Sequence, residues 1–349
     1  MRIESARTFA IDAPLVHSYV LSFTTLTSFT MRIVEVMLDS GRAGLGEVVA
    51  LPGYGLETDA DVADALERAC GSILGLAVED AIERLDAEYE ARPFARSAAI
   101  NAIEEARDGP LDRAIQWPQA GVLAAEDPAA CVRRAAELAE GGFGTIKVKV
   151  GRDVRTEVAC ARALLAENPG VGYRFDANQA YIESDAVRFL EALGDAGAVE
   201  LIEQPLAINA WDAFARLAQH SGVPLMLDES ILTESDIDRA ADVGASLIKL
   251  KLCKAPGRAG LIDQATRARG LGLGVVLGNG VSGPIGNLAE ARAWAHDPGL
   301  WAGAGEANGF AKLAEPVLHG GPTLEQGSLR FAGGPIALCE RPAAGGHHG

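Results

Sequence analysis

Three acidic residues in the middle of the chain have the spacing expected of a single catalytic or metal-binding site. Asp176, Glu203 and Asp228 each end a short apolar run, and they follow one another at intervals of 27 and 25 residues. This interval is about one strand plus one helix, so three successive parallel strands would bring the carboxylates to one face of a barrel. Clustered carboxylates repel one another unless a positive charge lies between them, and a hard divalent cation with oxygen ligands is the expected occupant.

Four lysines and two further polar residues continue the same rhythm on either side of these acids. The alternating runs 145–150 and 247–252 each place two lysines on one strand face. Two later apolar runs end in an asparagine and a glutamate. The residues at these strand ends are Lys147, Lys149, Lys249, Lys251, Asn279 and Glu306. A period of about 25 residues, held along this part of the chain, predicts a (β/α) barrel.

The chain is long enough to form the barrel that would hold these strand ends, together with a smaller domain. The chain has 349 residues, of which 48% are hydrophobic. We expect an α+β domain over residues 1–117, where strand-like alternation precedes a helical pattern, and the barrel over residues 118–316. We expect residues 317–340 to pack back on the first domain, and the Gly- and His-rich residues 341–349 to be a disordered tail.

Composition and charge exclude several classes of partner. The formal net charge is −17, from 31 basic and 48 acidic residues, which argues against nucleic acid and against an anionic membrane surface. We find no run of apolar residues long enough to span a bilayer and no export signal. The five cysteines are an odd number without a Cys-x-x-Cys pair, which is typical of a reduced protein. We therefore expect a cytoplasmic protein that is not bound to a membrane.

The motifs at the strand ends, taken in chain order, resemble those of the enolase superfamily. They are Lys-x-Lys at 147–149, Asp-x-Asn at 176–178, Glu-Gln-Pro at 203–205, Asp-Glu-Ser at 228–230 and the lysine at 251. More narrowly, they resemble the muconate-lactonising-enzyme (muconate cycloisomerase) subgroup of the mandelate racemase/muconate lactonizing enzyme family. The resemblance implies an α/β fold, a modified (β/α)8 TIM barrel of the (β/α)7β type, with an N-terminal α+β capping domain.

The resemblance also implies a reaction. Enolase-superfamily sites are known to use a lysine or histidine base and magnesium to form an enediolate from a carboxylate substrate. Carried over to this chain, Asp176, Glu203 and Asp228 would bind Mg²⁺, with Mn²⁺ as an alternative. Lys149 and Lys251 would be the acid and base on the two faces of the α-carbon.

Further residues receive supporting or substrate-binding roles from the same resemblance. Lys147 would act on Lys149 through like-charge proximity, while Asn178 and Glu229 would orient the metal ligands. The family pattern has asparagine where this chain has Lys249, which adds positive charge near the substrate. The residues expected to contact the substrate are Lys249, Asn279, Glu306 and, in loops of the capping domain, Tyr19, Phe23 and Tyr54. For Asn279 and Glu306, a turn or helix-capping role is equally compatible with the sequence.

Several functions remain open at the level of the sequence. Two lysines favour racemisation or epimerisation of an amino-acid derivative, and the same enediolate would serve a dehydratase or a cycloisomerase. A Schiff-base aldolase is a further option. A non-catalytic carboxylate-binding or structural protein should have lost a ligand or a lysine, and none is missing. The expected partners are a small-molecule carboxylate and, in a homo-oligomer, further copies of the chain.

Overall fold

The first part of the chain folds into an antiparallel sheet covered by helices. The computed structural model describes residues 1–20, 25–51, 57–194 and 197–340. The sheet has the order β1-β2-β3, and three helices follow it in the chain. The elements are β1 (Ile3–Val20), β2 (Thr25–Leu38), β3 (Ala43–Val48), α1 (Asp59–Ser72), α2 (Val78–Glu88) and α3 (Pro93–Asp108). This arrangement confirms the predicted α+β character of the N-terminal part.

Close packing of α3 on this sheet depends on two glycines and a row of alanines. A Cβ atom at Gly44 would lie 2.2 Å from the carbonyl oxygen of Ala102, and one at Gly46 would lie 1.9 Å from that of Ala98. Any larger residue at either position would therefore push the helix away from the sheet. The contact between α3 and β3 buries the alanine face of the helix.

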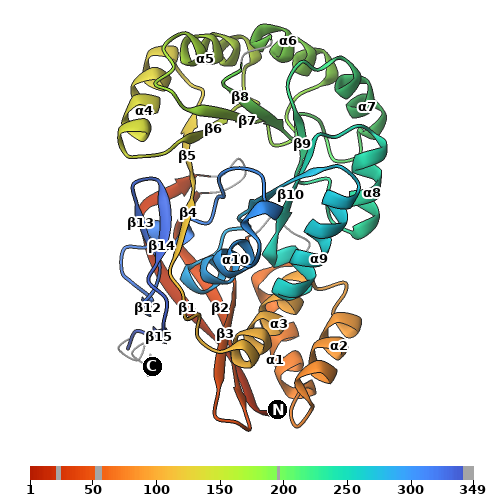
Figure 1. Cartoon of the computed structure of the whole chain (residues 1–349), viewed down its shortest axis with the longest axis vertical. Helices are drawn as coiled ribbons and strands as arrows, with labels where there is room; N and C mark the ends of the chain where they lie inside the picture. Colours follow the sequence, from red (N-terminus) through yellow and green to blue (C-terminus); the bar gives the residue numbers. More distant parts are fainter. Residues whose placement is uncertain (21–24, 52–56, 195–196, 341–349) are drawn as a thin grey trace, which may run out of the picture.

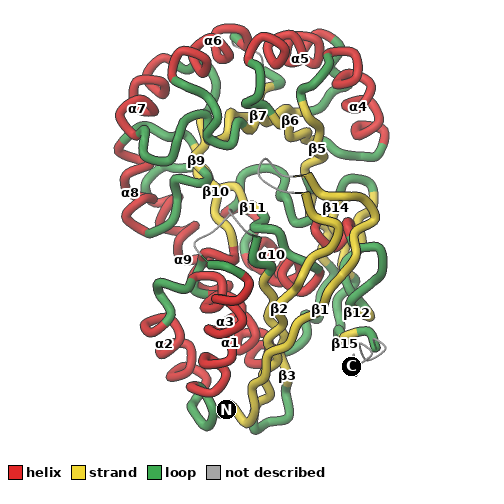
Figure 2. Tube along the Cα trace, turned by 180° about the vertical axis from the view of Figure 1, so that it is seen from behind, coloured by secondary structure: helices red, strands yellow, loops and turns green. Residues whose placement is uncertain are grey.

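The second part of the chain forms a parallel sheet of seven strands within the described residues, in the order β11-β10-β9-β8-β7-β6-β5. Its strands form an arc whose outer side is lined by helices (Figures 1 and 2). The strands are β5 (Ala120–Ala124), β6 (Thr145–Lys149), β7 (Gly172–Asp176), β8 (Val199–Glu203), β9 (Leu225–Leu227), β10 (Leu247–Lys251) and β11 (Gly274–Gly278). The intervening helices are α4 (Pro128–Glu140), α5 (Val154–Ala166), α6 (Glu183–Leu193), α7 (Trp211–His220), α8 (Glu234–Asp242), α9 (Gly257–Gly270) and α10 (Pro284–His296).

An irregular segment stands where the sequence predicted an eighth strand ending at Glu306. The segment reaches both outer strands of the arc, because the Ala302 amide donates to Val275 (2.7 Å) and the Ala120 amide donates to Gly305 (2.8 Å). Gly303 has φ +66° and Gly305 lies against the ring of Trp117, where a Cβ would come within 2.0 Å. Two glycines, one of them in the left-handed conformation, explain why a regular strand does not form here.

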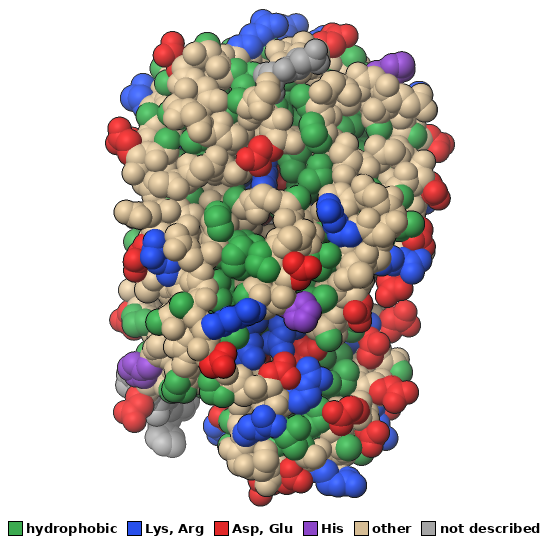
Figure 3. Space-filling model, in the orientation of Figure 1, with side chains coloured by type: hydrophobic (Ala, Val, Ile, Leu, Met, Phe, Trp, Pro, Cys, Tyr) green, Lys and Arg blue, Asp and Glu red, His purple; other side chains and the backbone are tan. Residues whose placement is uncertain are grey.

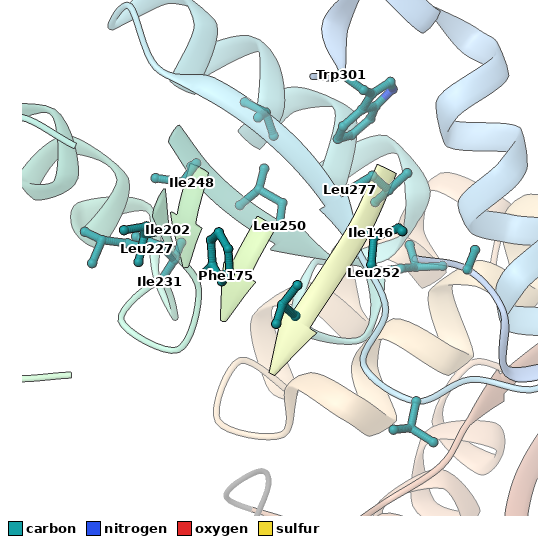
Figure 4. Packing of buried hydrophobic residues seen from close by; sticks show 14 of the residues in the cluster. Ile146, Phe175, Ile202, Leu227, Ile231, Ile248, Leu250, Leu252, Leu277 and Trp301 are labelled. Carbon is teal, nitrogen blue, oxygen red and sulfur yellow. The ribbon is translucent and has the colours of Figure 1, made fainter. Parts of the chain in front are cut away.

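Successive side chains along each strand alternate between the apolar core and the predicted site. The residues that face the helices are apolar and lie in one large core cluster. Figure 4 shows part of this cluster around the strands, with Ile146, Phe175, Ile202, Ile248 and Leu250 labelled. The alternate positions on the same strands carry the predicted lysines and acids, so they point into the interior of the arc. The predicted barrel class is thereby confirmed.

Two glutamates join the N-terminal elements to helices of the barrel. Glu47 of β3 accepts hydrogen bonds from the backbone amides of Gly283, Ile285 and Gly286, at the start of α10. Glu104 of α3 accepts from the amides of Arg258 (2.7 Å) and Ala259 (3.0 Å), at the start of α9. Each carboxylate thus satisfies helix amides that have no partner within their own helix.

The end of the chain forms short strands near the start of the barrel. β14 (Ser328–Phe331) pairs with β13 (Thr323–Glu325) and with β4 (Ile115–Pro118), while β12 (Leu318–His319) pairs with β15 (Ala337–Leu338). The predicted domain boundary at residue 117 falls inside β4, and the boundaries stay a prediction. The expected disordered tail, 341–349, lies outside the described residues.

None of the described helices combines the length and apolar character that crossing a bilayer requires. Figure 3 shows acidic and basic side chains mixed over one face of the molecule.

Candidate active site

Strand register places the predicted acids and lysines side by side. Lys149 on β6 lies opposite Asp176 on β7, which in turn lies opposite Glu203 on β8. Asp228 follows the last residue of β9, and Lys251 ends β10. Because all these strands are parallel, the side chains meet at their carboxyl ends, as the spacing predicted.

Lys147 is the ammonium group at the centre of this cluster. Its Nζ atom lies 2.9 Å from a carboxylate oxygen of Asp176 and 2.9 Å from one of Glu203. Burial alone would lower the pKa of Lys147, but the charges of Asp176 and Glu203 outweigh burial and hold its pKa well above the ordinary value. Lys147 is therefore a fixed positive charge between two acids.

The two predicted catalytic lysines lie on opposite sides of the acids. Lys149 contacts Asp176 at 2.6 Å, and 41% of its side chain is exposed. Lys251 contacts Asp228 at 2.7 Å, and only 3% of its side chain is exposed. Both contacts join an ammonium to a buried carboxylate, so each lysine is held in position by a predicted metal ligand.

The electrostatic environment differs among the three acids. Burial raises the pKa of Asp176, but the lysines, Lys147 foremost, outweigh it and hold the pKa below its ordinary range. For Asp228, burial is likewise outweighed by Lys251, and its pKa is lowered. Burial and the adjacent charge of Asp176 raise the pKa of Glu203 to about 7. Glu203 is therefore the acid whose charge costs most in this site.

The donor chemistry of the cluster fits a hard divalent cation. Glu203 Oε2 and Asp228 Oδ1 are buried and accept no well-aligned hydrogen bond, although lysine ammonium groups lie 2.9 and 2.7 Å away. Among the described residues, no group of three acidic, histidine or cysteine side chains stands ready to hold a metal ion, and ammonium groups lie against each acid instead. The oxygens that would accept a cation are present, since all three acids contribute carboxylates.

Asn178 and Glu229 extend the site beyond Lys149. The Lys149 ammonium donates to Asn178 Oδ1 (2.8 Å), and Asn178 Nδ2 donates to Glu229 Oε1 (3.0 Å). Asn178 has φ +43°, and its amide donates to Asp176 Oδ1 (3.0 Å). Asparagine tolerates this left-handed conformation, so one residue both turns the chain and links Lys149 to two acids.

Lys249 and Glu306 meet each other in the interior of the arc. The Lys249 ammonium lies 2.7 Å from Glu203 Oε1 and 2.7 Å from Glu306 Oε1. The Lys147 ammonium contacts Glu306 as well, at 3.2 Å. Burial raises the pKa of Glu306, but these two lysines outweigh it and lower the pKa. The structure thus joins both residues to the cluster of predicted metal ligands.

The remaining residues predicted to contact the substrate are Asn279, Tyr19, Phe23 and Tyr54. Asn279 follows β11, and its buried Oδ1 atom accepts no hydrogen bond from the described residues. Tyr19 packs edge-to-face on Phe29, with the Lys312 ammonium 4.4 Å from the centre of the Tyr19 ring. Phe23 and Tyr54 lie outside the described residues.

Two residues with clear roles were not predicted from the sequence. Gln204 accepts hydrogen bonds from the amides of Asp228 (3.0 Å) and Ser230 (3.2 Å), so it fixes the loop that carries a predicted ligand. Arg174 is buried and donates to Glu200 and to the carbonyl of Ala304, both at 2.7 Å. The Glu-Gln-Pro motif contained the signal for Gln204, whereas Arg174 sits at an inward strand position without a motif.

Comparisons with known proteins agree with this fold. A family model described as enolase C-terminal domain-like matches residues 130–335. Muconate cycloisomerase 1 of Pseudomonas putida is 29% identical, covering 81% of this chain and 83% of that protein. An L-Ala-D/L-Glu epimerase of Francisella tularensis subsp. novicida is 26% identical, covering 83% and 86%. The solved structure of a muconate lactonizing enzyme from Pseudomonas fluorescens, complexed with muconolactone, has a TM-score of 0.85 and 28% identity, covering 97% of each chain.

Proposed function

Because this chain is an enzyme of the enolase superfamily, we propose that it removes the α-proton of a carboxylate substrate and returns a proton to the same carbon. The proposal names racemisation or epimerisation of an amino-acid derivative as the reaction. The single observation that carries it is the placement of Lys149 and Lys251, on β6 and β10, at either side of the strands that carry the three acids. A lysine on each side allows one of them, as a neutral amine, to accept the proton from one face of a carbon, while the other, as an ammonium group, delivers a proton to the opposite face.

The roles of the acids follow from their chemistry. Asp176, Glu203 and Asp228 would hold Mg²⁺, or Mn²⁺ in its place, whose positive charge stabilises the enediolate oxygens. In this proposal Asp176 orients Lys149 and Asp228 orients Lys251, since each acid contacts its lysine at 2.7 Å or less. Lys147 supports Lys149 as a nearby fixed charge.

A cycloisomerase is the second candidate. Curated relatives named muconate cycloisomerase are 27–29% identical to this chain, which is slightly above the value for the epimerase. In that reaction a single lysine would act on the enediolate. Elimination of water from the same intermediate would instead make the protein a dehydratase.

Deuterium exchange tests the proposal directly. The protein would be incubated with Mg²⁺ in D₂O and a library of amino acids, N-acylated amino acids, dipeptides and muconate, and mass spectra would be read for deuterium uptake and for loss of water. Uptake without loss of water supports the racemase or epimerase. Lactone formation from muconate, or loss of water from another compound, would replace it with the second candidate or with a dehydratase.

Two lysine variants locate the chemistry. Lys149→Ala and Lys251→Ala should each abolish racemisation, because each removes one of the two proton-transfer groups. Mg²⁺ affinity, measured by calorimetry, should stay within a few-fold of wild type. The matched control is Arg152→Ala, which removes an exposed cation paired with Glu126 at 2.7 Å and should leave exchange unchanged. Loss of Mg²⁺ binding in either lysine variant would show that the site is misassigned.

A further inference from the structure

Lys249 is a buried lysine whose side chain packs against the neighbouring strand. Only 1% of its side chain is exposed. Its aliphatic part crosses over Gly278 of β11, where a Cβ atom would lie 2.4 Å from Lys249 Cδ and 2.6 Å from Cγ. Glycine at this position therefore leaves room for the lysine, and the ammonium group is directed into the interior of the arc.

The Lys249 ammonium contacts one carboxylate oxygen of Glu306, and the Lys147 ammonium contacts the other. Lys249 Nζ lies 2.7 Å from Glu306 Oε1, and Lys147 Nζ lies 3.2 Å from Glu306 Oε2. Both ammonium groups also contact Glu203 Oε1, at 2.7 and 3.0 Å. Two lysines and two glutamates thus form a closed group of alternating charges.

Glu306 is the more exposed of the two acids in this group. Its side chain is 13% exposed, whereas that of Glu203 is fully buried. A carboxylate in this position would bind a cationic group of a substrate if its oxygens were free. With both oxygens paired to lysines, a third ammonium would meet two like charges in a buried environment, which disfavours binding.

We propose that Lys249 is an internal substitute for a substrate cation, so that the site accepts carboxylates whose nitrogen is acylated or absent and rejects those with a free ammonium group. This inference rests on the proposed function and narrows its substrate class. It favours N-acylated amino acids over free amino acids and over dipeptides with an open N-terminus.

Matched pairs of compounds test the selectivity. Each pair consists of an amino acid or dipeptide and its N-acetylated form, and the rate of deuterium uptake is measured for both in D₂O with Mg²⁺. The wild-type protein should label the acetylated member at least about tenfold faster. Equal or faster labelling of the free forms would overturn the inference while leaving the proposed function intact.

A charge-removing variant separates this role from a merely structural one. Lys249→Met keeps the aliphatic part and removes the ammonium, so the preference for the acetylated member should fall by about tenfold. Lys254→Met is the matched control, since the Lys254 ammonium donates to the backbone carbonyl of Ile231 at 3.2 Å and not to Glu306. An unchanged preference in Lys249→Met, or an equal change in the control, would contradict the proposal.

A rescue experiment tests the premise of the proposal, an external ammonium group taking the place of that of Lys249 beside Glu306, even if no compound is labelled. Lys249→Ala leaves space over Gly278 beside Glu306, so n-propylammonium chloride should raise its melting temperature more than sodium chloride does. The same amine should have no such effect on wild type or on Lys254→Ala. If Lys249→Ala does not fold alone, recovery of folded protein on refolding with the amine becomes the measurement. Absence of rescue would contradict the premise that Glu306 can accept an external ammonium group in place of that of Lys249.

Discussion

Each of the three acids at the strand ends is balanced by at least one lysine, so the charges of single residues cannot be considered separately. Lys147 bridges Asp176 and Glu203, while Lys251 lies against Asp228. Removal of one partner from a buried ion pair leaves the other charge without compensation, and this costs more than the pair itself contributes. Substitutions that keep shape and change one charge are therefore the informative ones here.

Glu203→Gln is the residue-scale prediction for metal binding. It removes the central carboxylate while keeping its size, so Mg²⁺ affinity and activity should fall together. Calorimetric titration with Mg²⁺ and the exchange assay provide the two measurements. Glu200→Gln, on the same strand but paired with Arg174 at 2.7 Å, is the control and should keep its Mg²⁺ affinity. A Glu203→Gln protein that is active without magnesium would refute the ligand assignment.

At the scale of elements, the sequence was informative where the pattern is local and periodic. Alternation placed Lys147 with Lys149, and Lys249 with Lys251, on inward faces, because side chains alternate along a strand whatever its neighbours are. The segment that carries Glu306 has no such period, since Gly303 and Gly305 owe their conformation to long-range contacts with Arg174 and Trp117. The contact between Lys249 and Glu306 could not be predicted for the same reason.

The crossing of Lys249 over β11 gives an element-scale prediction. Gly278→Ala would place a methyl group against the aliphatic part of Lys249, so we expect a loss of about 1–3 kcal/mol in the free energy of unfolding. Urea denaturation measures it. Gly270→Ala is the matched control, because a Cβ there meets no atom within 4 Å and the residue ends α9. If both variants unfold at the same urea concentration, Lys249 does not follow this path.

At the scale of the whole molecule, buried carboxyl groups link stability to pH. Burial raises the pKa of Glu47 to about 7 and that of Glu290 to about 8. Glu290 accepts a hydrogen bond from Asn287 at 2.9 Å. Between pH 4.5 and about 8 the folded protein holds a proton on Glu290 that the unfolded chain has released, so the free energy of unfolding falls as pH rises.

Self-association and a cytoplasmic location stay predictions.

Glu290→Gln should remove the contribution of Glu290 to this pH dependence. The variant has no ionisable group at this position, so near about pH 9 it should be more stable than wild type by on the order of 1–4 kcal/mol, and the difference should vanish towards about pH 4.5. Urea denaturation across this range measures the difference. Glu137→Gln changes an exposed glutamate paired with Arg134 and should alter neither value. A constant difference at all pH values would mean that Glu290 keeps its ordinary ionisation.

Glu47 and Glu104 have a consequence for recombination between relatives of this protein. Together they accept hydrogen bonds from backbone amides at the starts of α10 and α9, although both glutamates belong to the N-terminal elements. A chimera that exchanged residues 1–117 for a segment without these two acids would leave those amides unsatisfied within a buried junction. The N-terminal elements and the barrel are therefore compatible only as a co-inherited pair.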